Sequence, residues 1–391
     1  MTKSVFRDGR FPGIMGAKIN RRHFLATIAA LPFWQVARSQ GKTISSGATL
    51  RPDGLISRVA FGSCAKQWLN QPIWDGVNRT CPDLFLFLGD AIYGDWHGEK
   101  LFVPTHESLL RDWWQLGAKP GFLRLRQTTP VMATWDNHDY GTHNGGAEFP
   151  LKEMSKRVFL DFFGEPQDSE RRRKPGIYTA KVLGPAGKRV QVILLDTRSF
   201  KGPFVKDPRS KEEKKAAGLS GSLGNYLPNR DPDVSLLGAA QWSWLEQQLR
   251  VPADLRLVAS STQVIPDQKG MDEWGNYPLE RSRLFDLFKS TGAENVVLLS
   301  GNVHFTEVSQ LPGSDFPLTE FTSSGMTHTD ERYASVESPY RVAGPSTQMN
   351  FGLVEIDWST KPSPLITLRA IGVDGDTLLE HRLPLHQLQP E

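Results

Sequence analysis

The sequence predicts an α/β fold with one large domain behind an N-terminal export signal. Three observations predict this class. Six short apolar segments alternate with segments of helical periodicity. Several of these apolar segments are continuously hydrophobic, as expected for strands covered on both faces. The C-terminal part changes to strand-like stretches with a tight-turn signal at Asp374-Gly375, which predicts an antiparallel edge. The 391 residues are enough to bury a sizeable core.

Residues 1–40 have the order of a cleavable signal. Arg21-Arg22 precedes a short apolar run at 26–34 and a small-residue exit near Ala37. The run is shorter than the roughly 18 apolar residues of a membrane span. The arginine pair resembles a twin-arginine signal, so we expect the twin-arginine translocase as a partner and a periplasmic or secreted protein. An amphipathic N-terminal helix of the mature protein is the alternative.

The predicted domain occupies residues 41–391. Strands are expected at 59–62, 84–88, 131–135, 190–195, 255–259 and 295–299. Helices are expected at 72–80, 109–116, 153–163, 239–249 and 279–290. In the helix at 239–249, Trp242, Leu245 and Leu249 share one stripe, which predicts a core-facing side. The β-rich C-terminal edge is expected at 350–358, 365–370 and from 378 onward.

Two segments leave alternatives open. The stretch 201–236 lacks periodicity and is too long for an ordinary connection, so it is either a mobile lid or a surface excursion. The basic cluster 171–174 is either a solvated loop or a patch that attracts an anionic substrate. The net charge of only +3 argues against a nucleic-acid partner.

The two cysteines are not expected to form a disulfide. Cys64 ends the first predicted strand, whereas Cys81 comes just before the second. In a βαβ unit, these two positions lie at opposite edges of the sheet.

Chemically active side chains follow the strands. Ligands gather at the carboxyl ends of strands in open α/β sheets. Four strand ends carry suitable groups, in order Cys64; Asp90 and Tyr93; Asp136, Asn137, His138 and Asp139; and Asn302 and His304. Each residue alone has an ordinary structural explanation, such as a core thiol or a turn. Their joint occurrence favours a metal site.

Each residue type suits such a site. The carboxylate of Asp90 can bridge two cations. Cys64 as a thiolate and Tyr93 as a phenolate favour a transition metal, and a phenolate is best matched to iron(III). Asn137 offers a neutral carbonyl oxygen and His304 a neutral imidazole.

The same set predicts phosphoryl chemistry. Two neighbouring cations would generate a bound hydroxide and stabilise charge on the phosphoryl oxygens. His138 could then protonate the leaving alkoxide, with Asp139 orienting its ring.

These motifs resemble those of metallophosphoesterases. Gly89-Asp90-x-x-Tyr93 and Asn137-His138-Asp139 resemble the blocks of purple acid phosphatases. The stretches 61–64, 135–139 and 301–304 look more like the alkaline phosphatase D (PhoD-like) branch, and the similarity covers about residues 58–358. The resemblance implies a four-layer α/β/β/α sandwich with two mixed sheets. It also implies a centre that holds Fe³⁺ and Ca²⁺.

By motif, the resemblance assigns roles to single residues. The implied metal ligands are Cys64, Asp90, Tyr93 and His304, with Asp136 or Asn137 supplying another. His138 would lie near the phosphate. Arg198 could contact the phosphate bidentately or form a structural ion pair with Asp196.

The sequence departs from this branch where three carboxylates are replaced by neutral amides. These amides are Asn137, Asn144 and Asn302. Asn302 is the most serious change, because it removes negative charge that would hold a calcium-like ion. The metal set is therefore expected to be smaller or weaker than in relatives.

The leading hypothesis is an exported phosphoric ester hydrolase that acts on a small-molecule mono- or diester. The alternatives are a phosphodiesterase or phospholipase D-like enzyme acting on envelope lipids or polymers, and a metal-depleted, non-catalytic envelope protein. A sulfatase is excluded, because Cys81-Pro82-Asp83 lacks the Cys-x-Pro-Ser-Arg context of formylglycine formation.

Overall fold

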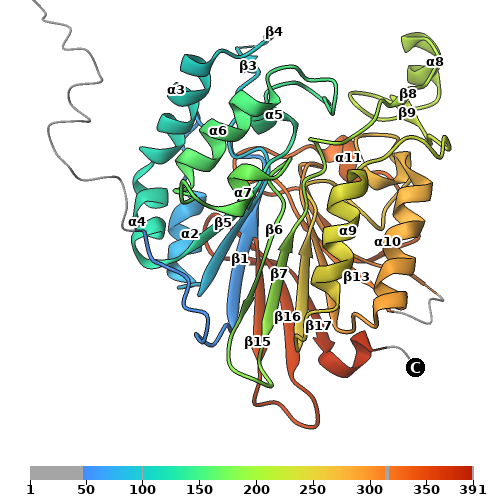
Figure 1. Cartoon of the computed structure of the whole chain (residues 1–391). Helices are drawn as coiled ribbons and strands as arrows, with labels where there is room; N and C mark the ends of the chain where they lie inside the picture. The colour runs from blue at the N-terminus through green and yellow to red at the C-terminus, as the bar shows by residue number, and fades with distance from the viewer. Residues whose placement is uncertain (1–46, 99, 313–316, 390–391) are drawn as a thin grey trace, which may run out of the picture. The chain divides into compact units, whose positions relative to one another are not determined.

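The computed structural model describes residues 47–98, 100–312 and 317–389, so the predicted signal lies outside the described residues. The described residues form one compact unit. Two large mixed sheets build this unit (Figure 1).

The six-stranded sheet has the order β17-β16-β15-β1-β2-β5. Its strands are β17 (Thr377–Pro384), β16 (Leu365–Gly372), β15 (Asn350–Asp357), β1 (Arg58–Gly62), β2 (Leu84–Leu88) and β5 (Val131–Thr134). β1, β2 and β5 run parallel, whereas β15 pairs antiparallel with β1. The predicted C-terminal strands thus form the antiparallel edge of this sheet.

The seven-stranded sheet has the order β14-β12-β13-β11-β10-β7-β6. Its strands are β14 (Arg341–Ser346), β12 (Thr306–Gln310), β13 (Thr319–Ser323), β11 (Val296–Ser300), β10 (Leu255–Ala259), β7 (Val190–Leu194) and β6 (Thr179–Leu183). Its four central strands, β7, β10, β11 and β13, run parallel.

The period-2 alternation of the strands explains the layers. Leu84 and Leu86 of β2 pack with Val190 and Val192 of β7 in one core between the sheets. Phe85 of β2 faces the opposite way, into the core beneath the helices. The two sheets therefore pack face to face.

Helices cover both outer faces, as predicted (Figure 1). The six-stranded sheet is covered by α2 (Ile73–Arg79), α3 (His106–Gly117), α4 (Pro120–Thr128) and α6 (Lys152–Phe162). The seven-stranded sheet is covered by α9 (Gly238–Leu249) and α10 (Pro278–Thr291). Trp242, Leu245 and Leu249 are buried in that second helical layer, as their spacing predicts. The α/β/β/α sandwich is confirmed.

The two segments for which the sequence leaves alternatives open, 201–236 and 171–174, both make defined contacts. Within 201–236, β8 (Val205–Lys206) pairs with β9 (Tyr226–Leu227), and α8 (Lys211–Ala216) lies between them in sequence. The basic cluster overlaps α7 (Glu170–Arg173). Arg171 is buried and donates to the carbonyls of Ala133 and Ile177, and Arg172 pairs with Asp161. The prediction of a solvated basic loop is thus wrong for these two arginines, because they tie up carbonyls and a carboxylate of their own chain.

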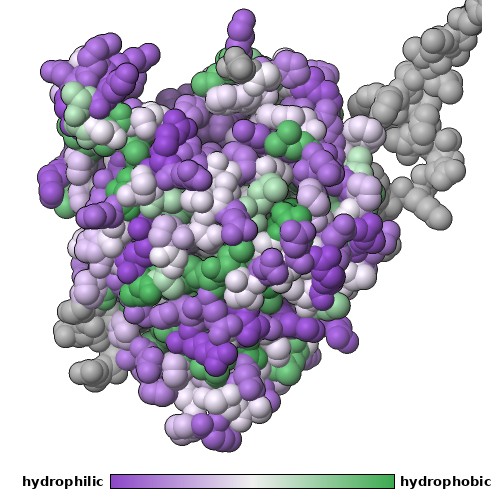
Figure 2. All heavy atoms as spheres, turned by 180° about the vertical axis from the view of Figure 1, so that it is seen from behind, coloured by the Kyte–Doolittle hydropathy of each residue, from purple (hydrophilic) through white to green (hydrophobic). Residues whose placement is uncertain are grey.

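The face in Figure 2 is mostly hydrophilic, with hydrophobic residues scattered among the polar ones. Among the described residues, no helix is both long and apolar enough to cross a bilayer.

Candidate metal centre

The carboxyl ends of β1, β2 and β11 deliver three metal-binding groups to one place. The ligand atoms of Cys64, Asp90 and His304 all lie within 4.8 Å of one another. The Cys64 Sγ atom lies 3.6 Å from Asp90 Oδ2. The prediction that these side chains converge is confirmed.

The two sheets meet at this point. The backbone N–H groups of Gly325 and Met326, which follow β13, donate to the carbonyl of Ser63, which follows β1. The Ser324 hydroxyl lies 3.2 Å from Cys64 Sγ and accepts a hydrogen bond from the His304 N–H at 2.9 Å. Ser324 therefore joins ligand candidates that come from different sheets.

Four of the predicted ligands have left-handed backbone conformations. The φ angles are 61° for Cys64, 50° for Asp90, 70° for Asn302 and 60° for His304. Such values are uncommon outside glycine, and they cluster at functional sites, where the surrounding structure holds them.

Burial sets the protonation of the cluster. Burial, reinforced by Asp90, raises the pKa of the Cys64 thiol well above its ordinary value. Burial raises the pKa of Asp90 to about 7, although His138 opposes the shift. Burial, His138 and Lys66 together lower the pKa of His304 to about 3, so its imidazole is neutral, as a metal ligand requires.

Tyr93 is buried beside the same cluster. Burial, followed by the negative charges of Cys64 and Asp90, raises the pKa of its phenol. The phenol oxygen lies 3.1 Å from His328 Nε2. The Tyr93 ring stacks on His138, with ring centroids 4.2 Å apart. A bound cation would have to stabilise the phenolate for Tyr93 to serve as a ligand.

The family profile of PhoD-like phosphatases matches residues 59–361, which is more than half of the chain. The chain belongs to the PhoD-like phosphatase family. Members of this family are phosphoric ester hydrolases, in agreement with the resemblance seen in the sequence.

The PhoD-like chain is also similar to two individual proteins. Alkaline phosphatase D from Bacillus subtilis (strain 168) is 25% identical over 288 residues, which cover 62% of this chain and 46% of the relative. The chain thus spans less than half the length of that curated relative. The solved structure of PhoD superimposes with a TM-score of 0.60 at 17% identity, covering 85% of this chain and 73% of that chain. This second likeness shows the fold.

Asp136 lies within the site of this PhoD-like chain, but the role predicted for Arg198 is wrong. The Arg198 guanidinium is fully buried and pairs with Asp136 and Asp272. It is therefore closed to a phosphate. The predicted ion pair with Asp196 is also wrong, since Asp196 accepts the backbone N–H of Arg198, at 2.9 Å, and the Arg198 guanidinium pairs elsewhere.

One oxygen of Asp136 has no protein partner. Asp136 Oδ1 accepts bonds from Arg198 and Ser261, whereas the buried Oδ2 has no hydrogen-bond donor in the described part of the chain. The negative charge of Asp136 also raises the pKa of Asp90, after the larger effects of burial and His138. A buried carboxylate oxygen without a donor fits a bound cation, because an unpaired charge is otherwise costly.

His138 has a different orienting partner from the one predicted. Its Nδ1 lies 2.6 Å from Asp95 Oδ1. Asp139 instead accepts the backbone N–H groups of Ile92 and Asp136 at 2.9 and 3.0 Å, and so caps the short helix α5 (Asn137–Tyr140). The prediction that Asp139 orients His138 is therefore wrong. Asp95 directly follows Gly94 in the loop after β2. Its acidic side chain is the one feature of the sequence that could have indicated this role.

The two amides differ in their surroundings. The Asn137 amide nitrogen lies 3.3 Å from His143 Nδ1, which leaves its carbonyl oxygen for another partner. Asn302 is half-buried and donates from Nδ2 to the Asp272 carbonyl at 2.9 Å. Their roles as ligands remain predictions.

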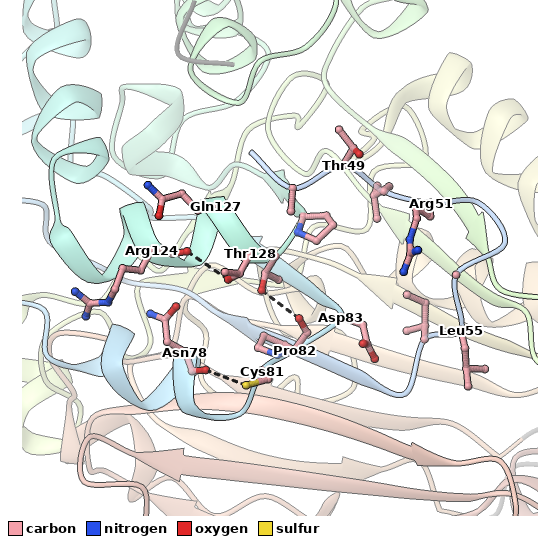
Figure 3. A pocket seen from close by; sticks show the side chains of 16 residues that line it. Thr49, Arg51, Leu55, Asn78, Cys81, Pro82, Asp83, Arg124, Gln127 and Thr128 are labelled. Carbon is pink, nitrogen blue, oxygen red and sulfur yellow. Dashed lines mark hydrogen bonds between the residues drawn. The ribbon is translucent and has the colours of Figure 1, made fainter. Parts of the chain in front are cut away.

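The cysteines are both free, as predicted, with Cys64 buried and Cys81 exposed. Cys81 lines a cavity of about 810 Å³ at the amino ends of β1, β2 and β5 (Figure 3). Arg51, Asp83 and Arg124 also line it. This cavity lies at the edge of the sheet opposite to the strand ends that carry the ligand candidates, and it contains none of the predicted site residues.

Proposed function

We propose that this PhoD-like chain is an exported, metal-dependent hydrolase of phosphate mono- or diesters. The observation that carries the proposal is the convergence of Cys64, Asp90 and His304 within 4.8 Å at the carboxyl ends of three strands. A thiolate, a carboxylate and a neutral imidazole in one buried site form a donor set for a transition metal.

The proposed metals are Fe³⁺ and Ca²⁺. The phenol of Tyr93 favours iron(III), and the free Oδ2 of Asp136 offers the hard oxygen that calcium prefers. Asn137 and Asn302 would add neutral oxygens. Cations bound there would activate water and neutralise charge on the phosphoryl oxygens.

The protein's own contribution to the reaction is a positioned proton donor. Burial alone would lower the pKa of His138, but Asp90 and Asp95 outweigh it and raise the pKa. The protonated imidazole, held by Asp95 and stacked on Tyr93, is suited to give a proton to the leaving alkoxide.

The test is metal analysis and turnover of protein exported and purified without chelators. We expect bound iron and calcium, hydrolysis of 4-nitrophenyl phosphate or bis(4-nitrophenyl) phosphate, and a visible charge-transfer band from a Tyr93–iron(III) bond. Preference for the diester would favour the phosphodiesterase alternative. Sub-stoichiometric metal and no turnover after reconstitution would favour a non-catalytic envelope protein.

Asp90→Asn is expected to abolish activity and to lower the metal content, because the variant loses the carboxylate that both ions would share. Turnover should fall by at least about a hundredfold, by analogy with the loss of other essential catalytic groups. Activity and elemental composition are measured on the same preparation. A fully active, fully metallated variant would contradict a bridging role.

Export by the twin-arginine translocase is proposed from the sequence at 21–22. Replacing Arg21 and Arg22 together by lysine should leave the protein in the cytoplasm of the producing bacterium. Fractionation of cells that express the wild type and the variant measures this. Equal amounts of both proteins in the periplasm or medium would argue against this route.

A further inference from the structure

One cation beside the candidate centre has no ion-pair partner within the described ranges. Lys66 lies two residues after Cys64, and its Nζ atom lies 5.5 Å from the centre of the Tyr93 ring. Tyr93 is one of the residues that the motif assigns to the metal site, so the ammonium lies beside the candidate centre. Lys66 is only half-buried, in contrast to the buried residues on either side of it.

Three other cations of the described chain near the site are either paired or inaccessible. Arg198 is enclosed by two carboxylates. Lys269 donates to Gln263 at 2.7 Å and lies 3.9 Å from Glu307. Lys201, like Lys66, lies over an aromatic ring and has no ion-pair partner among the described residues, but it is only 2% exposed and a solute cannot reach it. None of these three is placed to meet a phosphate at the cluster.

The backbone of Lys66 is held in place. Its N–H donates to Thr327 Oγ1 at 2.9 Å, and its carbonyl accepts from Gln71 Nε2 at 3.1 Å. Only the side chain remains free to follow a ligand. The backbone of Lys66, two residues after Cys64, is therefore fixed. Its long side chain brings the ammonium over the Tyr93 ring.

We propose that Lys66 is a substrate-binding residue that favours phosphate monoesters over diesters at this centre. The inference rests on the proposed hydrolase function. A monoester near neutral pH carries up to two negative charges, because its second pKa is near 6, whereas a diester carries one. A monoester also has one more unsubstituted oxygen that can accept a hydrogen bond. An unpaired ammonium therefore stabilises the bound monoester more than the bound diester.

The test compares Lys66→Met and Lys66→Arg with wild type. Lys188→Met serves as the charge control, since Lys188 is exposed in the turn between β6 and β7, outside the site. We measure kcat/KM for 4-nitrophenyl phosphate and bis(4-nitrophenyl) phosphate, together with metal content. Lys66→Met should lose about tenfold on the monoester and less than about threefold on the diester, while Lys66→Arg retains most of the monoester activity. Lys188→Met should match wild type.

A second readout does not depend on turnover. Inorganic phosphate is titrated into the metal-loaded proteins by calorimetry, and Lys66→Met should bind it about tenfold more weakly than wild type and Lys188→Met. Equal phosphate affinity, or equal losses of kcat/KM on both substrates, would overturn the role of Lys66. Absence of turnover in wild type would refute the proposed function instead, while the titration would still decide whether Lys66 binds phosphate.

Discussion

Three neighbouring carboxylates in the site differ in what they bind. Asp136 holds a guanidinium with one oxygen and leaves the other free. Asp139 accepts the Asp136 N–H at the start of α5 and the Ile92 N–H of the loop after β2. Asp95 hydrogen-bonds to the ring of His138, which lies 43 positions away in the sequence. The sequence predicts that carboxylates gather here, but it cannot assign partners, because each pairing depends on how distant loops pack.

Asp95→Asn is expected to lower kcat by about 10- to 100-fold, because an amide no longer fixes the imidazole orientation and charge of His138. Metal content should remain at the wild-type level, since Asp95 contacts His138 and not the cluster. Steady-state kinetics with elemental analysis measures both. Asp139→Asn is the contrasting variant, and its main effect should be on stability. Wild-type kcat in Asp95→Asn would show that another group orients His138.

Glu273 should make stability depend on pH. It is buried, Oε1 accepts the Gly270 N–H at 2.8 Å, and Oε2 has no donor among the described residues. Burial raises the pKa of Glu273 to about 7, although Lys269 opposes the shift, and Asp267 raises it further. A raised pKa means that the folded state binds the proton more tightly. The stabilising contribution is therefore complete below the unfolded-state pKa and is lost as the pH rises through about 7.

Glu273→Gln should therefore change the free energy of unfolding little at pH 4 and raise it by about 1 to 3 kcal/mol at pH 8. Urea unfolding of wild type and variant across this range measures the difference. The exposed Glu337→Gln should show no such trend. A constant difference between wild type and Glu273→Gln at all pH values would refute the explanation.

At the scale of elements, the turn after β2 requires glycine. Gly89 has a φ of +93°, and an added Cβ would lie 2.7 Å from the backbone nitrogen of Asp136 and closer still to its Cβ. This close approach brings the end of β2 against the end of β5. It sets Asp90 and Asp136 beside each other.

Gly89→Ala is expected to lower the free energy of unfolding by about 3 kcal/mol, through backbone strain and overpacking. Gly292→Ala is the matched control, because Gly292 also has a left-handed φ, of 62°, but its Cβ would meet nothing within 4 Å. The control should cost only about 1 kcal/mol. Denaturant unfolding measures both, and equal costs would show that the contact with Asp136 is unimportant.

The hydrophobic pattern of the sequence explains which strands could be predicted and which could not. The apolar strands β1, β2, β5, β7, β10 and β11 were all identified, with ends within one or two residues. By contrast, the sequence does not predict β6, β12, β13 or β14. Of these, β12 and β13 bury polar side chains. Glu307 is fully buried and bonds Gln263 and Arg341, and Glu320 accepts the Val264 N–H. Partners distant in sequence satisfy these groups, so no local apolar pattern marks the strands.

At the scale of the whole molecule, the division of the strands between two sheets is not encoded in periodicity. Each apolar segment would fit either sheet equally well. Only the family resemblance predicts that there are two sheets. Arg198 shows what holds the sheets in register at the site. It follows β7 of one sheet and binds Asp136, which follows β5 of the other.

Arg198→Met is expected to lower the free energy of unfolding by about 3 to 5 kcal/mol, because Asp136 and Asp272 lose their common partner in a buried place. Arg198→Lys should recover part of the loss. Arg250→Met removes an exposed pair with Glu246 and should cost less than about 1 kcal/mol. Urea titrations compare the three. A small loss in Arg198→Met would mean that water or neighbouring residues replace the guanidinium.

The left-handed backbone at Cys64, Asp90, Asn302 and His304 has an evolutionary consequence. Each of these positions would be conformationally easier for glycine, so selection for a robust fold alone would erase the side chains that collect at the cluster. A library selected only for thermal tolerance should drift toward glycine at these four positions and so lose the side chains of the candidate metal centre.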